Sequence, residues 1–447
     1  MAQKSSSDWL KSALPIVAQF EGYHVSWLPR DVTAGLAIAA VALPVGVAYP
    51  AIAGLPPAVG LYASILPLIG YAIFGSSRQL IVGPDAATLT ILAASLSQAS
   101  ATGSEQQRVV ASAAFAIVVG MTCLLAGALR LGFIGNFLSR PILTGYLCGM
   151  SLTLLVGQLS RLTTVPLDGK GLVRPLIEFS GKLTQIHAPT LVLGLGMFLL
   201  LRLLRWVSPR SPGPLIAVIV GTILSFLFSL ESQGISSIGK IPASLPSLSL
   251  RIPEGIGLDD LIQDAFGIFI VSFGSGIVTA RSFGAKNRYR VNSNRELIGF
   301  GAANIASGLF GGFPVTGADS RTAINDAVGG RTQVAGLVAA AVLTLVLVAL
   351  TDAMKYLPVA VLGAVIASAA LDLFDAKELR RLWQTSQAEF MFALIAMLGV
   401  IAFGVLRGVL IAIVATGVYL LARVSRPRDA LLGCIPGRDG FHKLHRE

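Results

Sequence analysis

The sequence predicts an all-α polytopic membrane protein with fourteen transmembrane segments, arranged as two halves of seven. Composition is the first reason: 54% of the 447 residues are hydrophobic and 13% are charged, whereas soluble chains average about 25% charged residues. Apolar stretches long enough to cross a bilayer, about 17–25 residues, also recur along the chain. Finally, most Lys and Arg residues fall on one side of these stretches, which is typical of membrane proteins.

In chain order, the first half contains predicted segments at residues 32–49, 56–74, 80–96, 109–129, 137–157, 190–206 and 214–229. The second half contains predicted segments at residues 261–280, 297–312, 315–328, 333–350, 357–374, 390–406 and 408–421. The third and tenth are short and interrupted by Gly and Pro. A polar loop at 158–189 includes an amphipathic stretch, 172–183, which we expect to lie at the membrane interface as a helix. Residues 230–258 form a second long loop.

The positive charges predict the orientation. With the N-terminus in the cytoplasm, 24 of the 34 Lys and Arg residues lie on the cytoplasmic side, nine lie on the other side, and Arg321 lies within a segment. The net charge of +11 is therefore explained by membrane orientation, and nucleic-acid binding is not expected. Residues 1–30 are a cytosolic N-terminal segment without the apolar core of a cleaved signal peptide. We expect both termini in the cytoplasm and, in a bacterium, a location in the inner membrane.

The two halves match in spacing. Pro84 lies 52 residues after the start of the first segment (84 − 32), and Pro314 lies 53 residues after the start of the eighth (314 − 261). Seven segments per half also place the two halves in opposite orientations, as in an inverted repeat. Paired interrupted segments at corresponding positions are the best sequence indication of a transporter binding site.

The first interrupted segment resumes as a helix after Gly83 and Pro84. Proline suits the first turn of a helix, where its missing N–H would have no partner. The free N–H groups of Ala86, Ala87 and Thr88 then point into the membrane interior at the positive end of the helix dipole. This arrangement predicts an anion site.

The second interrupted segment, residues 312–322, has the same pattern and includes Thr316, Gly317, Ser320 and Arg321. Two half-helix N-termini facing each other at mid-membrane could bind an anion, and Arg321 adds a full positive charge. An arginine within a span is a functional candidate. Alternatively, Arg321 is a structural partner of one of three acids, Asp319, Asp326 or Asp85.

Several motifs around these residues resemble those of the SulP (sulfate permease) anion transporter family. In the first half they are residues 43–49, 53–57, 60–64 and 74–78; in the second half they are 304–305, 313–317, 320–323, 332–337, 356–358 and 425–427. The resemblance extends over roughly residues 25 to 440. It implies a seven-plus-seven inverted repeat with short half-helices three and ten, and a small anion as substrate.

The resemblance also implies two domains and a homodimer. A mobile core would comprise residues 31–130 and 261–351, and a scaffolding gate would comprise residues 137–231 and 357–424. Residues 425–447 would be a cytosolic linker, after which a STAS domain would follow; we expect that the chain was truncated before that domain.

In the family the anion lies between segments three and ten and is lined also by segments one and eight. Tyr49 would form an aromatic wall, and Ala86 and Ala87 would donate amides. Ser320 would help coordinate the anion and Arg321 would supply the positive field. The other lining positions that we carry over are Thr88, Ser275, Thr316 and Gly317.

The chain departs from the family pattern at three places. Val45 replaces a common glutamine, and Ser275 occupies the place of an acid in the eighth segment. Asp85 and Asp319 instead stand at the two half-helix starts. They are either helix caps or the site of coupling to a proton or a sodium ion, and Asp85 is our first choice for coupling because no cation lies close to it in its own segment.

The leading hypothesis is therefore a secondary transporter that moves a small anion by an elevator motion. Sulfate, bicarbonate, chloride, nitrate and small dicarboxylates all fit two facing rows of amides. An uncoupled anion channel or exchanger would need no coupling acid. A nucleobase–cation symporter would need a pair of glutamates in segments eight and ten, which this sequence lacks. An enzyme is disfavoured, and no cofactor or metal is expected, because the segments contain no His, Cys pair or Ser/His/Asp set.

Overall fold

The computed structural model describes most of the chain. The described residues are 22–99, 104–132, 140–167, 172–208, 212–239, 256–349 and 354–403, with isolated positions at 245–246, 248, 251, 411 and 414 and two short strands at 432–434 and 441–443.

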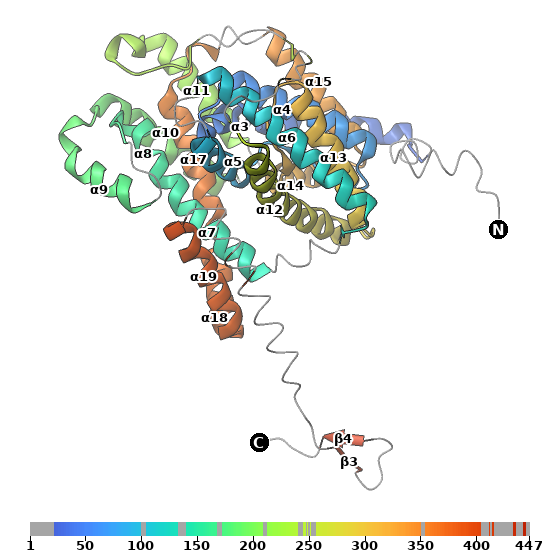
Figure 1. The fold of residues 1–447 in the computed structure, drawn as a ribbon. Helices are drawn as coiled ribbons and strands as arrows, with labels where there is room; N and C mark the ends of the chain where they lie inside the picture. Colours follow the sequence, from blue (N-terminus) through green and yellow to red (C-terminus); the bar gives the residue numbers. More distant parts are fainter. Residues whose placement is uncertain are drawn as a thin grey trace.

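Helices dominate the first half (Figure 1). In chain order the main elements are α3 (Leu28–Ala48), the 3-10 helix η2 (Tyr49–Ala53), α4 (Pro57–Phe74), β1 (Val82–Gly83), α5 (Ala86–Ala99), α6 (Glu105–Ala128), α7 (Arg140–Gly157), α8 (Leu159–Thr163), α9 (Val173–Gly181), α10 (Ala188–Val207) and α11 (Gly213–Phe228). Short 3-10 turns, η1 (Val25–Trp27), η4 (Leu183–Gln185) and η5 (Leu230–Gln233), complete this half.

The second half repeats the pattern. Its elements are α12 (Leu258–Lys286), α13 (Ser293–Leu309), β2 (Thr316–Gly317), α14 (Asp319–Val328), α15 (Val334–Ala349), α17 (Val359–Leu373), α18 (Ala376–Thr385), α19 (Gln387–Phe403), β3 (Leu432–Cys434) and β4 (Phe441–Lys443).

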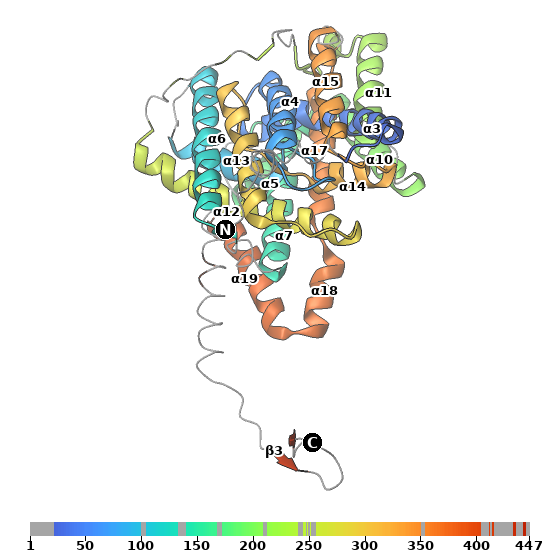
Figure 2. The ribbon, with the colours of Figure 1, turned by 90° about the vertical axis from the view of Figure 1, so that its right-hand side faces the viewer.

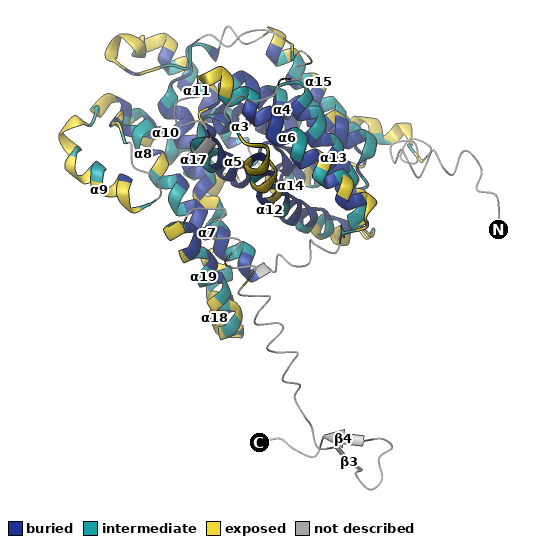
Figure 3. Cartoon of the chain, viewed as in Figure 1, coloured by how far each residue is buried: buried dark blue, intermediate teal, exposed yellow. Residues whose placement is uncertain are grey.

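Each of the first thirteen predicted segments corresponds to a described helix, and the fourteenth, 408–421, falls almost entirely outside the described residues. Within the described part of the chain, seven helices are both long and apolar enough to cross a membrane, and four shorter helices are also apolar. The amphipathic stretch at 172–183 includes α9, much of which is coloured as exposed in Figure 3. Helix α18 was not predicted, because its charged sequence suggested a loop.

Helices of the two halves interleave in one group. Helix α13 packs against α4 and α6, and α15 packs against α3 and α4. Glycines permit these close contacts: a Cβ on Gly120 of α6 would lie 2.9 Å from the backbone oxygen of Gly301 on α13. Small residues at helix contacts are typical of membrane proteins, where backbones approach closely.

A second group is built from α7, α10, α17 and α19. Helix α7 packs against α19 and α17, and α10 packs against α17. Figures 1 and 2 show α18 and α19 at the lower end of this group, beyond the interleaved helices. Helix α10 is the most exposed of the long apolar helices, with 22% of its apolar window buried, as expected for a helix with one face toward lipid.

Candidate functional site

The two interrupted segments lie side by side. Strands β1 and β2 pair antiparallel, with Val82 opposite Gly317 and Gly83 opposite Thr316. The N–H of Ala318 extends the pairing by donating to the oxygen of Ile81 at 2.8 Å. Helix α5 begins at Ala86, shortly after β1, and helix α14 begins at Asp319, shortly after β2. The two short half-helices predicted from the two prolines are therefore present. They are joined by a strand pair that the sequence did not predict.

Side chains satisfy the rest of the irregular backbone before β2. Asn304 of α13 accepts from the N–H of Val315 at 2.8 Å and donates to the oxygen of the same residue at 3.0 Å. Ser307 donates to the oxygen of Phe313 at 2.7 Å. Non-helical backbone at membrane depth is tolerated only where such partners exist. The sequence analysis noted Asn304 only within the family motif at 304–305 and predicted no role for it, although a polar residue in an apolar helix was available as a signal.

The backbone before β1 is held by the other half of the chain. Gln333 donates to the oxygens of Ser77 at 2.9 Å and Leu80 at 2.8 Å. The Thr322 hydroxyl accepts from the N–H of Ile81 at 3.0 Å. Helix α14 and the start of α15 therefore fix the position of the first half-helix as well as the second.

Arg321 connects the two interrupted segments at the centre of the site. Its side chain is buried, and Nη2 donates to the backbone oxygen of Pro84. Nη1 is also buried and has no hydrogen-bond partner among the described residues. It lies against Gly83, where an added Cβ would come within 2.5 Å of Nη1 and where φ is +153°. A glycine is thus required at position 83 to make room for the guanidinium.

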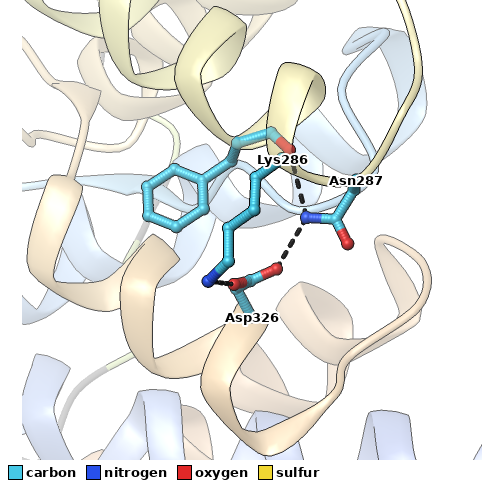
Figure 4. Close-up of polar contacts among 4 residues, drawn as sticks. Lys286, Asn287 and Asp326 are labelled. Carbon is cyan, nitrogen blue, oxygen red and sulfur yellow. Dashed lines mark hydrogen bonds and ion pairs between the residues drawn. The ribbon is translucent and has the colours of Figure 1, made fainter.

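Of the three acids predicted as partners of Arg321, Asp85 lies within electrostatic range. Asp326 instead binds Lys286 at 2.5 Å and the amide nitrogen of Asn287 at 2.6 Å (Figure 4). This cluster ties the end of α12 to α14. Asp326 therefore pairs with Lys286 and not with Arg321.

The carboxylate of Asp85 caps α5. It accepts from the N–H of Thr88 at 3.1 Å and lies 3.4 Å from the Thr88 hydroxyl. The N–H of Ala87 also faces this carboxylate. Two of the three amides predicted to bind an anion, those of Ala87 and Thr88, thus have a carboxylate from the same chain as a partner. Ala86, Ala87 and Thr88 are all buried.

Asp319 is placed differently. It is the first residue of α14 and makes no side-chain cap there; its carboxylate accepts from the hydroxyl of Thr279 on α12. That hydroxyl is also 3.0 Å from the oxygen of Ser275. Asp319 and Ser320 are both exposed, so the start of α14 is open while the start of α5 is covered.

The remaining predicted residues surround this centre. Tyr49 begins η2, which packs against α5, and it lies within electrostatic range of Asp85 and Arg321. Ser275 is half-buried on α12. The hydroxyl of Thr316 donates to the oxygen of Ser272 at 2.5 Å, so it points to α12. Gly317 packs against Gly276: a Cβ added to Gly317 would lie 3.1 Å from the Cα of Gly276.

Tyr146 is a residue that the sequence analysis missed. It lies on α7, is buried, and is within electrostatic range of Asp85. Its hydroxyl donates to the sulfur of Met150 at 3.3 Å. An aromatic residue between Gly145 and Gly149 could have indicated a close approach of α7 to the site.

Comparison with known proteins identifies the family. A family model described as the sulfate permease family matches residues 28–396. A probable sulfate transporter of Mycobacterium tuberculosis is 43% identical over 431 residues, which cover 96% of this chain and 77% of the relative. The chain belongs to the sulfate permease family. Probable sulfate transporter 3.3 of Arabidopsis thaliana is 34% identical over 447 residues, covering 96% of this chain and 70% of that protein.

Solved structures agree on the fold of this sulfate permease family member. The murine Solute Carrier 26 family member A9 anion transporter, in the inward-facing state, matches with a TM-score of 0.89 at 22% identity, covering 99% of this chain and 76% of that chain. The transmembrane domain of a cyanobacterium bicarbonate transporter, BicA, matches with a TM-score of 0.77 at 24% identity, covering 88% of this chain and 98% of that chain. The predicted polytopic all-α fold is confirmed.

Proposed function

We propose that this sulfate permease family member is a secondary active transporter that binds a small anion between the N-termini of α5 and α14. The observation that carries the proposal is the pairing of β1 with β2, which brings both half-helix starts next to the buried Arg321. Helix N-termini favour anions through free amides and the positive end of the dipole. A buried guanidinium N–H without a partner adds a strong donor for the same ligand.

Sulfate is the first candidate substrate. The Mycobacterium and Arabidopsis relatives described above are both named probable sulfate transporters. A full positive charge at the site also favours a divalent anion, because Coulomb energy scales with ligand charge. Bicarbonate, chloride, nitrate and small dicarboxylates are the alternatives to be measured beside it.

The two groups of helices support an elevator mechanism. The proposed core contains α3 to α6 of the first half and α12 to α15 of the second, which interleave, and the proposed gate contains α7 to α11 and α17 to α19. Both half-helices belong to the core. A displacement of the core relative to the gate would therefore move both half-helices together and keep the contacts between them.

Asp85 is our first candidate for proton coupling. Its carboxylate faces the N–H groups of Thr88 and Ala87, which are the donors proposed for the anion. The ionised carboxylate competes with the substrate for these donors and repels it. The neutral form does neither, so proton binding and anion binding favour each other. Asp319 is the second candidate for coupling, to a proton or a sodium ion.

An uncoupled anion channel or exchanger is the second candidate function. In that case, Asp85 serves as a helix cap, which its bond to Thr88 supports. Under either function, we propose a homodimer in the cell membrane, in contact with lipid and with both termini in the cytoplasm.

The test is uptake of radiolabelled anions by the purified chain in proteoliposomes. Sulfate, bicarbonate, chloride and nitrate are compared with and without imposed proton and sodium gradients. Sulfate uptake that accelerates with an inward proton gradient supports coupled transport. Gradient-independent flux of several monovalent anions favours the channel or exchanger, and absence of any anion flux contradicts both.

A further inference from the structure

Arg161 connects the proposed gate to the proposed core. It lies on α8, directly after α7, and its Nη2 donates to the backbone oxygen of Ala51 at 2.5 Å. Ala51 belongs to η2, the 3-10 helix that begins at Tyr49 and packs against α5. The bond therefore runs from the gate to an element of the anion site, across the boundary along which an elevator motion takes place.

The guanidinium of Arg161 is held in position from within the gate. Its Nη1 donates to Oε1 of Gln158 at 2.7 Å. Gln158 is buried, and its own amide donates to the oxygen of Leu154 at 3.3 Å. Gly363 of α17 leaves room for this arrangement, because an added Cβ there would lie 3.0 Å from the Cβ of Arg161.

Both of these acceptors are uncharged. A hydrogen bond from a charged donor to a neutral oxygen contributes more to stability than a bond between neutral groups. It avoids the large cost of separating a buried ion pair, in which both partners would be left charged. The contact with Ala51 therefore suits a bond that forms in one state and breaks in another.

The residues around the site differ in exposure between the side of Arg161 and the side of α14. Helix α3 has 21 residues, so its two ends are about 30 Å apart at 1.5 Å per residue. At the far end, Asp31 accepts from the N–H of Arg331, just beyond α14, at 2.6 Å. On α14, Asp319 and Ala323 are exposed. On the side of Arg161, Tyr49, Ala53 and Leu55 are buried, Ala51 is half-buried, and Gly54 is exposed at the end of η2.

We propose that the bond between Arg161 and Ala51 is a latch that closes one end of the anion site and opens during each transport cycle. The proposal rests on the transport function and deepens it. When the latch is broken, η2 separates from α8, and Tyr49 and Ala53 become accessible from that end. Removal of the Arg161 side chain should therefore shift the population toward the state that is open on this side.

The experiment measures thiol labelling of the purified full chain. The reporter is Ala53→Cys, which is buried while the latch is closed; Ala323→Cys, already exposed, reports on general loosening. Both are made in a Cys434→Ser background, since Cys123 and Cys148 are buried. Arg161→Ala should raise the labelling rate of the Ala53→Cys reporter about tenfold, the lower end for a hydrogen bond to a charged group, without raising that of Ala323→Cys.

Two further variants test the geometry. Gln158→Leu, which releases Arg161 without removing its charge, should give a smaller increase of the same kind. Arg202→Ala removes an arginine that pairs with Asp372 inside the proposed gate, and it should change neither reporter.

The labelling assay needs no substrate, so it separates the latch from the transport function. Increased labelling of Ala53→Cys in a chain that moves no anion retains the latch and rejects the function. Active anion uptake with unchanged labelling in Arg161→Ala overturns the latch. Equal increases at both reporters also overturn it, because Arg161 would then be a general packing residue.

Discussion

Replacement of Arg321 by alanine should weaken the binding of a divalent anion far more than that of a monovalent one. The guanidinium touches Pro84 and Gly83, and the amides of Ala86 and Ala87 begin two residues farther along the chain. An anion that accepts from these amides and from Nη1 of Arg321 is therefore about 4 Å from the charge, given hydrogen bonds of about 3 Å.

The size of the effect follows from Coulomb's law. At about 4 Å and an effective dielectric constant of about 20, one pair of unit charges interacts by roughly 4 kcal/mol. A chloride ion would lose roughly that much, and a sulfate ion roughly twice as much. The dissociation constant of sulfate should therefore rise about 1,000-fold more than that of chloride, since about 1.4 kcal/mol corresponds to a factor of ten.

The assay is equilibrium binding of radiolabelled sulfate and chloride to the purified chain. Arg321→Lys serves as the control, because it keeps the charge but cannot reproduce both the contact with Pro84 and the free Nη1. It should retain most of the preference for the divalent anion. If Arg321→Ala weakens sulfate and chloride by the same factor, the charge does not act on the anion and Arg321 only connects the two half-helices.

Three other substitutions probe the site. Asp85→Asn keeps a capping residue but removes the charge. Anion binding at neutral pH should therefore tighten, and acceleration of uptake by an inward proton gradient should disappear. If only Asp319→Asn removes that acceleration, the coupling residue is Asp319. Asn304→Ala leaves both polar backbone groups of Val315 without their partner. The free energy of unfolding, measured by thermal unfolding, should therefore fall by about 3 kcal/mol. Asn287→Ala, at an exposed position, should have little effect. Gly83→Ala places a Cβ against Nη1 of Arg321 and should abolish anion binding. Gly157→Ala, with no atom within 4 Å of its added Cβ, should leave anion binding unchanged. Normal binding in Gly83→Ala would show that Arg321 can move aside.

The prolines of the two halves predicted the interrupted segments because proline and glycine restrict the backbone locally. The pairing of Val82 with Gly317 could not be predicted, since strands of two residues are too short to show the alternation that reveals a strand. Helix α18 was missed for a different reason. Its start carries a capping signal, with Asp375 accepting from the N–H of Glu378 at 2.9 Å, but its charged residues outweighed that signal.

The sequence made Arg321 and Asp85 candidates, because charged residues within membrane segments are rare. It could not predict the side chains that hold the backbone around them. Gln333 and Arg161 bind backbone oxygens, of Leu80 and Ala51 respectively. Every residue has a backbone oxygen, so such a partner leaves no pattern in the sequence, and only the fold brings these groups together.

The position of a bound anion tests the central claim most directly. Selenate can replace sulfate, and its selenium atom can be located by anomalous scattering in crystals of the full chain. We expect one selenium peak near the N-termini of α5 and α14, with selenate oxygens about 3 Å from the amides of Ala86 and Ala87 and from Nη1 of Arg321. A selenate ion bound elsewhere, with the carboxylate of Asp85 still on the N–H of Thr88, would contradict the account.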